Sequence, residues 1–275
     1  MRSTTGWSRR GWLITLSVAG LAGLAGLSTA GLACSRSDQL REREALNVAA
    51  AMSLREAMAR VERGYETANP EINVALNLAG SQALAAQILA GAATDVFVSA
   101  DEAQMQRLVD ADLADAAIEI ASNRLVAIAA RGSGLRLPEH LGRAGTKVVL
   151  AAPEVPAGAY ARQALDRLSL RREVEANLVS EEDNVRAVVQ KVSLGEADAG
   201  LVYATDVRAA DPGSVTLIEL PGAESIRATY VAAALRGARD LQRARAFVER
   251  LRGPEVQAIF AELGFGPIAA AQAST

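Results

Sequence analysis

The chain of 275 residues contains one cysteine, Cys34, and one histidine, His140. With one residue of each kind, a zinc site or a Cys–His catalytic pair has almost nothing to build from. No disulfide bond can form within the chain. Aromatic residues make up only 4% of the sequence, whereas hydrophobic residues of all kinds make up 50%. This composition suits one large or two modest globular domains.

The sequence also lacks a run of basic residues. Its formal net charge is −3. Three of the 29 basic residues, Arg2, Arg9 and Arg10, precede position 34, which leaves 26 basic against 32 acidic residues in the rest of the chain. Nucleic-acid binding depends on basic side chains that neutralise phosphates, so a mildly acidic chain is a poor candidate for it. We therefore expect no nucleic-acid partner.

Residues 1–33 have the pattern of a signal peptide for export. The three arginines come first, an apolar stretch rich in Gly, Ala and Leu follows, and small residues end it. Gly31-Leu32-Ala33-Cys34 resembles a bacterial lipobox, with Gly31 where leucine is commoner. An uncleaved anchor helix is the alternative, because the apolar stretch is about long enough to span a bilayer. We expect a lipoprotein with a lipid on Cys34, a polar tether over residues 34–44, and a periplasmic, membrane-anchored location.

Two serines stand where a predicted strand gives way to a predicted helix. Residues 46–51 form a short apolar run typical of a buried strand, and apolar residues recur at helical spacing after Ser53. Residues 72–78 alternate as a half-buried strand does, and Ser81 opens the helical run that follows. A lone serine there is most often a helix cap. The same place can bind an anion, because the first amides point outward and the helix dipole favours negative charge.

The rest of the chain continues this alternation of strands and helices. Asp101 is expected to cap a helix. Pro156 fits a first helical turn, where its missing N–H costs nothing, and Ala157 offers a free amide beside it. Val185 stands at another helix start, and Tyr203 lies near the carboxyl end of a strand. Further predicted strands and helices cover residues 95–99, 125–130, 148–152, 159–168, 200–204, 225–235, 240–251 and 254–263.

Strands and helices that alternate with short links indicate an α/β architecture with mostly parallel sheets flanked by helices. In such sheets, ligands bind beyond the carboxyl ends of the strands. Five residues fall at strand ends or helix starts: Ser53, Ser81, Ala157, Val185 and Tyr203. We therefore expect one site drawn from two halves of the chain.

Five short motifs carry a family resemblance. In chain order they are Ala49-Ala50-Ala51-Met52-Ser53-Leu54, Ala79-Gly80-Ser81, Asp95-Val96-Phe97-Val98-Ser99-Ala100-Asp101, Pro153-Glu154-Val155-Pro156-Ala157-Gly158 and Leu201-Val202-Tyr203. Together they resemble the periplasmic molybdate-binding proteins of ABC transporters, over about residues 46–265. One departure is Met52, where the family more often has a small residue.

The resemblance implies a two-lobed periplasmic-binding-protein fold of type II that closes on a tetrahedral oxyanion. Lobe one would comprise residues 45–126 and 229–270, and lobe two residues 127–228. The implied ligand is molybdate or tungstate, and the implied partner is an ABC transporter permease. The protein would be a monomer without a cofactor, and molybdenum would bind only as the oxyanion. Hydroxyls of Ser53, Ser81 and Tyr203 and backbone amides of Ala157 and Val185 would hold the ion.

The chemistry of these five residues suits an oxyanion on its own terms. All are uncharged donors, so a fully ionised dianion fits, whereas a ligand that must donate a proton finds no acceptor. Arg55 and Arg186 neighbour the site in sequence. We expect both to be solvated helix residues, because side chains one position along a helix point elsewhere.

Three kinds of alternative remain open from the sequence. A serine hydrolase would need a base for Ser53 or Ser81, and His140 is the only candidate. The ligand could instead be sulfate, an organic anion or ferric iron, and iron would want paired tyrosines with carboxylates, whereas Tyr160 and Tyr203 lack an obvious acidic partner. The effector domain of a transcription regulator can share this lobed form, but the export signal and the missing DNA-binding segment argue against it. We expect a binding protein and not an enzyme.

Overall fold

The structure, a computed structural model, describes residues 43–268. The predicted signal peptide, Cys34 and most of the predicted tether lie outside these residues. Within the described range, no helix is both long enough and apolar enough to cross a membrane.

The first group of strands is built from both ends of the described chain. Its strand order is β2-β1-β3-β9-β4. The bounds are β1 Glu44–Ala51, β2 Ile72–Ala79, β3 Val96–Ser99, β4 Ile118–Ala130 and β9 Arg227–Ala234. Strands β1 and β2 pair in parallel from Glu44↔Ile72 to Ala51↔Ala79. This register ends both strands at the same edge of the sheet. The helical segments that follow β1 and β2 therefore begin side by side.

The second group of strands comes from the middle of the chain and shares β4 with the first. Its order is β4-β7-β5-β6, and β8 also pairs with β4. The bounds are β5 Val148–Ala151, β6 Leu178–Glu182, β7 Ala199–Tyr203 and β8 Val215–Ile218. Strand β5 pairs in parallel with both β6 and β7, so these strands also present their carboxyl ends at one edge.

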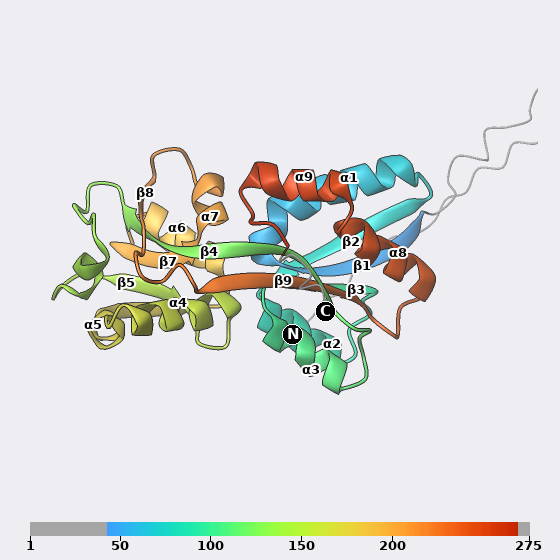
Figure 1. Ribbon diagram of the computed structural model, residues 1–275, viewed down its shortest axis with the longest axis horizontal. Coiled ribbons are helices and arrows are strands. Elements are labelled where there is room, and N and C mark those ends of the chain that lie inside the picture. The colour runs from blue at the N-terminus through green and yellow to red at the C-terminus, as the bar shows by residue number, and fades with distance from the viewer. Residues whose placement is uncertain (1–42, 269–275) are drawn as a thin grey trace, which may run out of the picture. The chain divides into compact units, whose positions relative to one another are not determined.

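Two long strands, β4 and β9, connect the groups (Figure 1). The first part of β4 pairs with β9 as far as Arg124↔Arg227, and from Leu125 onward it pairs with β7. The described antiparallel strand pairs all involve β4 or β9. Each group therefore contains a set of parallel strands, β1 to β3 in the first and β5 to β7 in the second, and the antiparallel strands β4 and β9 lie between these two sets.

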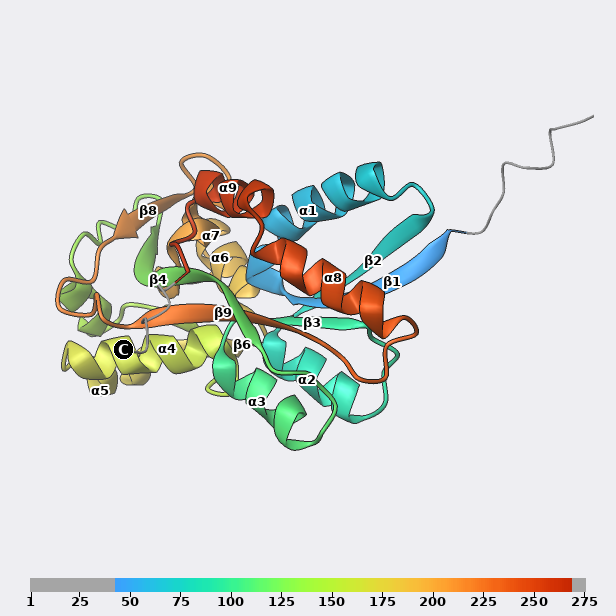
Figure 2. The same ribbon diagram turned by 45° about the vertical axis from the view of Figure 1, so that its right-hand side comes forward.

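Helices follow most strands and flank the sheet (Figure 2). Their bounds are α1 Arg55–Ala68, α2 Ser81–Leu89, α3 Glu102–Asp110, α4 Pro156–Arg167, α5 Arg171–Ala176, α6 Val185–Ser193, α7 Ala204–Ala209, α8 Leu241–Leu251 and α9 Pro254–Leu263. Short 3₁₀ turns span Met52–Leu54 and Pro138–Gly142. The main hydrophobic core runs from Leu46 to Phe265 in sequence, and a smaller one under α2 and α3 includes Leu84, Phe97 and Leu108.

Most of the predicted elements are confirmed, with shifted ends. Strand β1 begins at Glu44, two residues before the predicted start, and helix α4 begins at Pro156 and not at 159. Strand β4 begins at Ile118 and not at 125. The prediction missed its first part because the polar residues Ser122 and Asn123, which are buried, interrupt the apolar pattern. The elements missed by sequence reasoning are β6, β8, α5 and α7, each of four to six residues.

Candidate functional site

One small pocket lies where the carboxyl ends of the strands from both groups meet. Its lining residues are Ala51, Met52, Ser53, Gly80, Ser81, Ala100, Val155, Pro156, Ala157, Asn184, Val185 and Tyr203. All five predicted ligand residues are among them, and no lining side chain is charged. The cavity volume is about 20 Å³, a little above the roughly 10–15 Å³ that one water requires. A small inorganic ion therefore suits the pocket better than an organic molecule.

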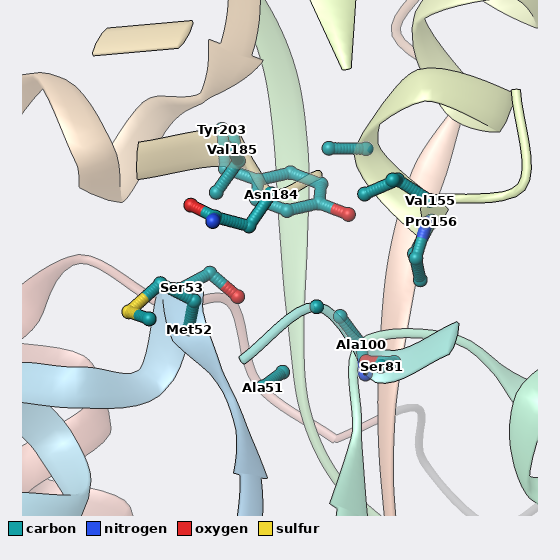
Figure 3. Close-up of a pocket in the computed structure, with 12 residues that line it drawn as sticks. Ala51, Met52, Ser53, Ser81, Ala100, Val155, Pro156, Asn184, Val185 and Tyr203 are labelled. Carbon is teal, nitrogen blue, oxygen red and sulfur yellow. Dashed lines mark hydrogen bonds between the residues drawn. The ribbon is translucent and has the colours of Figure 1, made fainter. Parts of the chain in front are cut away.

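Figure 3 shows two sides of the pocket. Ser53 and Ser81 lie on one side, Ser53 in the 3₁₀ turn after β1 and Ser81 at the start of α2, which follows β2. Asn184, Val185 and Tyr203 lie on the other, with Val155 and Pro156 beside them. The sides come from different halves of the chain, as the sequence predicts.

The two serines present hydroxyl donors to the pocket. Ser53 is 4% exposed and Ser81 is 1% exposed. Neither caps its helix, because the cap positions are held by other residues and no side-chain cap bond forms. Ser53 Oγ accepts a hydrogen bond from Tyr230 Oη at 3.0 Å, and Ser81 Oγ accepts one from the Ala100 backbone N–H at 3.0 Å. Each hydroxyl proton is thus left to donate.

Helix starts supply donors on the opposite side. Pro156 opens α4, and Ala157 follows in its first turn, where backbone N–H groups have no partner within the helix. Gly158 is required there, since a Cβ atom would lie 2.0 Å from the Ala152 carbonyl oxygen. Helix α6 begins at Val185, and its cap is Asn184, whose Oδ1 accepts the Ala187 N–H at 3.1 Å.

Tyr203 contributes a buried hydroxyl that lacks a partner among the described residues. It is the last residue of β7 and is 1% exposed. Burial raises the pKa of the Tyr203 phenol well above its ordinary value, so the group stays protonated and can donate. A buried polar group without a partner costs about 1–3 kcal/mol, and a bound oxyanion would remove that cost.

The prediction that Arg186 is solvated is wrong. Its side chain is 19% exposed, it forms an ion pair with Glu56 of α1, and its Nε lies 3.3 Å from Oδ1 of Asp206. The side chain does point away from the pocket, but it points at acidic groups on two other helices. Burial raises the pKa of Asp206 to about 7, although Arg186 acts to lower it. Arg55 is exposed, as predicted.

Direct contacts join the two sides around the pocket. Gln82 Nε2 donates to the Asp183 carbonyl oxygen at 2.8 Å, and Gln104 Nε2 donates to the Glu154 carbonyl oxygen at 3.4 Å. Gly80 packs so close to Asp183 that a Cβ atom would lie 2.4 Å from its carbonyl oxygen. The structure therefore has the pocket closed. Asp101 caps α3 beside it, as predicted, by accepting the Gln104 N–H.

The geometry does not support the alternative sites. His140 does not line the pocket, and its Nδ1 accepts a hydrogen bond from the Arg136 backbone N–H at 3.2 Å. No base therefore stands beside either serine in the described structure. Tyr160 does not line the pocket either. Within residues 43–268, no group of three or more His, Cys, Asp or Glu side chains could hold a metal ion.

The fold and pocket are those of a solute-binding protein, and comparison with known proteins gives the family. Residues 46–266 match the bacterial extracellular solute-binding proteins, and the chain belongs to this family. The molybdate-binding protein ModA of Mycobacterium tuberculosis is 34% identical over 248 residues, which cover 89% of this chain and 93% of that protein. The resemblance seen in the sequence motifs is thereby confirmed.

Solved structures show the same fold. The Azotobacter vinelandii periplasmic molybdate-binding protein aligns with a TM-score of 0.72 at 23% identity, over 80% of this chain and 98% of that one. The sulfate-binding protein SubI from Mycobacterium tuberculosis aligns with a TM-score of 0.70 at 16% identity, over 83% and 88% of the two chains. The predicted α/β periplasmic-binding-protein fold is confirmed, and the fold by itself does not choose between the two ligands.

Proposed function

We propose that this protein captures molybdate, or tungstate, outside the cytoplasm and delivers it to an ABC transporter permease. The observation that carries the proposal is the buried Tyr203 hydroxyl, which has no partner within residues 43–268 and faces the pocket of two serine donors and two helix starts. Charge-assisted hydrogen bonds to an anion are shorter and roughly twice as strong as neutral ones. The identity of 34% to ModA supports molybdate as the ion.

The donor set favours an ion that carries no proton. The lining side chains are uncharged, and the one lining amide oxygen, Asn184 Oδ1, already accepts a backbone N–H. Hydrogen phosphate would bring a proton that only a hydroxyl oxygen could accept, and that hydroxyl would have to turn its own proton away from the ion, so hydrogen phosphate should bind poorly. Sulfate carries no proton, and hydrogen bonding alone does not reject it. It is smaller than molybdate, so a donor shell set for the larger ion would leave its contacts too long.

The five ligand residues belong to two lobes in this proposal. Lobe one comprises residues 45–126 and 229–270, lobe two comprises residues 127–228, and β4 and β9 form the hinge between them. Ser53 and Ser81 then belong to lobe one, and the other three ligand residues to lobe two. The contacts across the pocket, such as Gln82 with Asp183, support a closed state of such a hinge.

The remaining features follow from a capture role. The protein binds its ligand without a reaction, needs no cofactor, and acts as a periplasmic monomer. The signal peptide of residues 1–33 and the lipobox ending at Cys34 support a lipoprotein held at a membrane near its permease. Sulfate capture is the alternative, and its support is limited to the shared fold.

Calorimetry of the purified protein tests the proposal. Molybdate and tungstate should bind alike, sulfate far more weakly, and phosphate poorly. Ser81→Ala and Tyr203→Phe should each weaken molybdate binding roughly tenfold to a hundredfold, since a hydrogen bond to a charged group contributes about 1.5–3 kcal/mol. Tyr65→Phe is a matched control, because Tyr65 packs against Phe247 in the core and does not line the pocket. Sulfate binding as tight as molybdate binding, or wild-type affinity in both site variants, would contradict the proposal.

A further inference from the structure

A chain of hydrogen bonds ends at the Ser53 hydroxyl. Tyr230 Oη donates to Ser53 Oγ at 3.0 Å. Asn123 Nδ2 in turn donates to Tyr230 Oη at 3.5 Å. Ser53 is 4% exposed, Tyr230 0% and Asn123 3%. Neither Tyr230 nor Asn123 lines the pocket, so this chain approaches Ser53 from behind.

The direction of the chain is fixed at its far end. The Arg124 backbone N–H, which can only donate, bonds to Asn123 Oδ1 at 3.0 Å. That bond turns the Asn123 amide nitrogen toward Tyr230 and toward Thr205 Oγ1, to which it also donates at 2.9 Å. Tyr230 Oη accepts a hydrogen bond from the Asn123 amide and donates one to Ser53 Oγ. Burial keeps the pKa of the Tyr230 phenol above its ordinary value, so the hydroxyl remains a donor.

We propose that Tyr230 and Asn123 are positioning residues that make Ser53 a donor to the pocket and thereby set the selectivity against protonated oxyanions. This inference rests on the proposed capture of an oxyanion. Ser53 Oγ already accepts the Tyr230 proton from behind, and its own proton finds an acceptor in the pocket ion. If Ser53 turned to accept a proton from hydrogen phosphate, its own hydroxyl proton would lose that partner in a buried place.

Ser81 follows the same rule with a different device. Its oxygen accepts the Ala100 backbone N–H, which also can only donate. The polarity of Ser81 is therefore fixed by the main chain, whereas that of Ser53 depends on two side chains. A side-chain substitution can therefore reverse the polarity of Ser53 but not that of Ser81.

The Asn123→Asp change reverses the chain with almost no change in shape. One carboxylate oxygen still accepts the Arg124 N–H, and the other must accept where the amide nitrogen donated. The Tyr230 hydroxyl then donates its hydrogen bond to the carboxylate. Tyr230 Oη is left to accept a hydrogen bond from the Ser53 hydroxyl. Ser53 would present a lone pair to the pocket, which suits the proton of hydrogen phosphate.

Competition for bound molybdate tests the inference in wild type, Asn123→Asp, Tyr230→Phe and the control Tyr65→Phe. Sulfate and phosphate compete at mildly alkaline pH, where both are dianions and only phosphate carries a proton. Their affinity ratio cancels the repulsion that a new carboxylate exerts on any dianion. Asn123→Asp should raise the ratio of hydrogen phosphate to sulfate affinity roughly tenfold. Tyr230→Phe should weaken molybdate binding roughly twofold to tenfold, since it removes one neutral hydrogen bond that orients Ser53.

Thermal unfolding of each variant identifies any that fail to fold. If Asn123→Asp does not fold, the molybdate affinity of Tyr230→Phe still tests the inference. A ratio unchanged in a folded Asn123→Asp, or molybdate affinity in Tyr230→Phe equal to that of Tyr65→Phe, would overturn the positioning role while molybdate binding by wild type still stood. A wild-type protein that binds no oxyanion would overturn the proposed function and this inference with it.

Discussion

Arg186 of helix α6 forms an ion pair with Glu56 of helix α1, which is 130 positions away in the sequence. The pair joins the two proposed lobes next to the pocket, one residue after the Val185 amide. Because the Glu56 side chain is 40% exposed, water screens the pair, and such pairs contribute roughly 0.2–1 kcal/mol.

We expect Glu56→Gln to speed the release of molybdate up to about fivefold, because a closed state loses part of its stabilisation. Glu262→Gln is the matched control, since Glu262 pairs with Arg60 within proposed lobe one. Stopped-flow displacement measures both release rates. Equal rates in the two variants would show that the Arg186–Glu56 pair does not hold the pocket closed.

A second prediction concerns the hinge strands. If β4 and β9 bend when the pocket opens, the protein without ligand should be more extended on average than the protein with molybdate. Small-angle scattering should then give a smaller radius of gyration at saturating molybdate. A profile that does not change with ligand would indicate a rigid site or a wrong division into lobes.

Asp206 should make stability depend on pH. Burial raises its pKa from an ordinary 3.8 to about 7, so the folded protein holds a proton that the unfolded chain releases between these values. The stabilisation from this proton is complete below about pH 4, is lost as the pH rises toward 7, and amounts to a few kcal/mol at most.

Urea unfolding of wild type and Asp206→Asn across this range measures the effect. Asparagine keeps an oxygen that can accept the Tyr203 N–H, which Asp206 Oδ2 now accepts at 3.1 Å. The free energy of unfolding of wild type should fall relative to that of the variant from about pH 4 to about pH 7 and then level off. A difference between the two proteins that stays constant with pH would refute the raised pKa.

Export and lipidation give a prediction for residues outside the described range. The mature chain should begin at a lipidated Cys34, and Cys34→Ser should lose the lipid and either become soluble or stay unprocessed. Mass spectrometry of the mature protein from its native membrane checks this. An unmodified Cys34 in that sample would rule out the lipobox.

The local pattern was enough to predict the strand-to-helix turns of the pocket. Ser53 and Ser81 follow strands whose apolar residues are contiguous or alternate, and those patterns are set by near neighbours in the chain. The contact of Asn123 with Tyr230 could not be predicted in this way, because it depends on the antiparallel register of β4 with β9. Among the lining residues that the sequence analysis did not name as ligands, Asn184 could have been found, since an asparagine before a helix is a common cap.

Arg186 shows the same limit on charged residues. Helical spacing correctly turned its side chain away from the pocket, but spacing within α6 says nothing about what other helices place there. Glu56 of α1 and Asp206 of α7 meet it only in the folded chain. The missed strands β6 and β8 are short, and few of their residues are buried, so their sequences carry little apolar signal.

A crystal structure of the protein with molybdate, with anomalous data at the molybdenum edge, tests the proposed site most directly. We expect one anomalous peak in the pocket, with ion oxygens within hydrogen-bond distance of Ser53 Oγ, Ser81 Oγ and Tyr203 Oη and of the Ala157 and Val185 amides. A peak at another place, with Tyr203 Oη still without a partner, would contradict the proposed site.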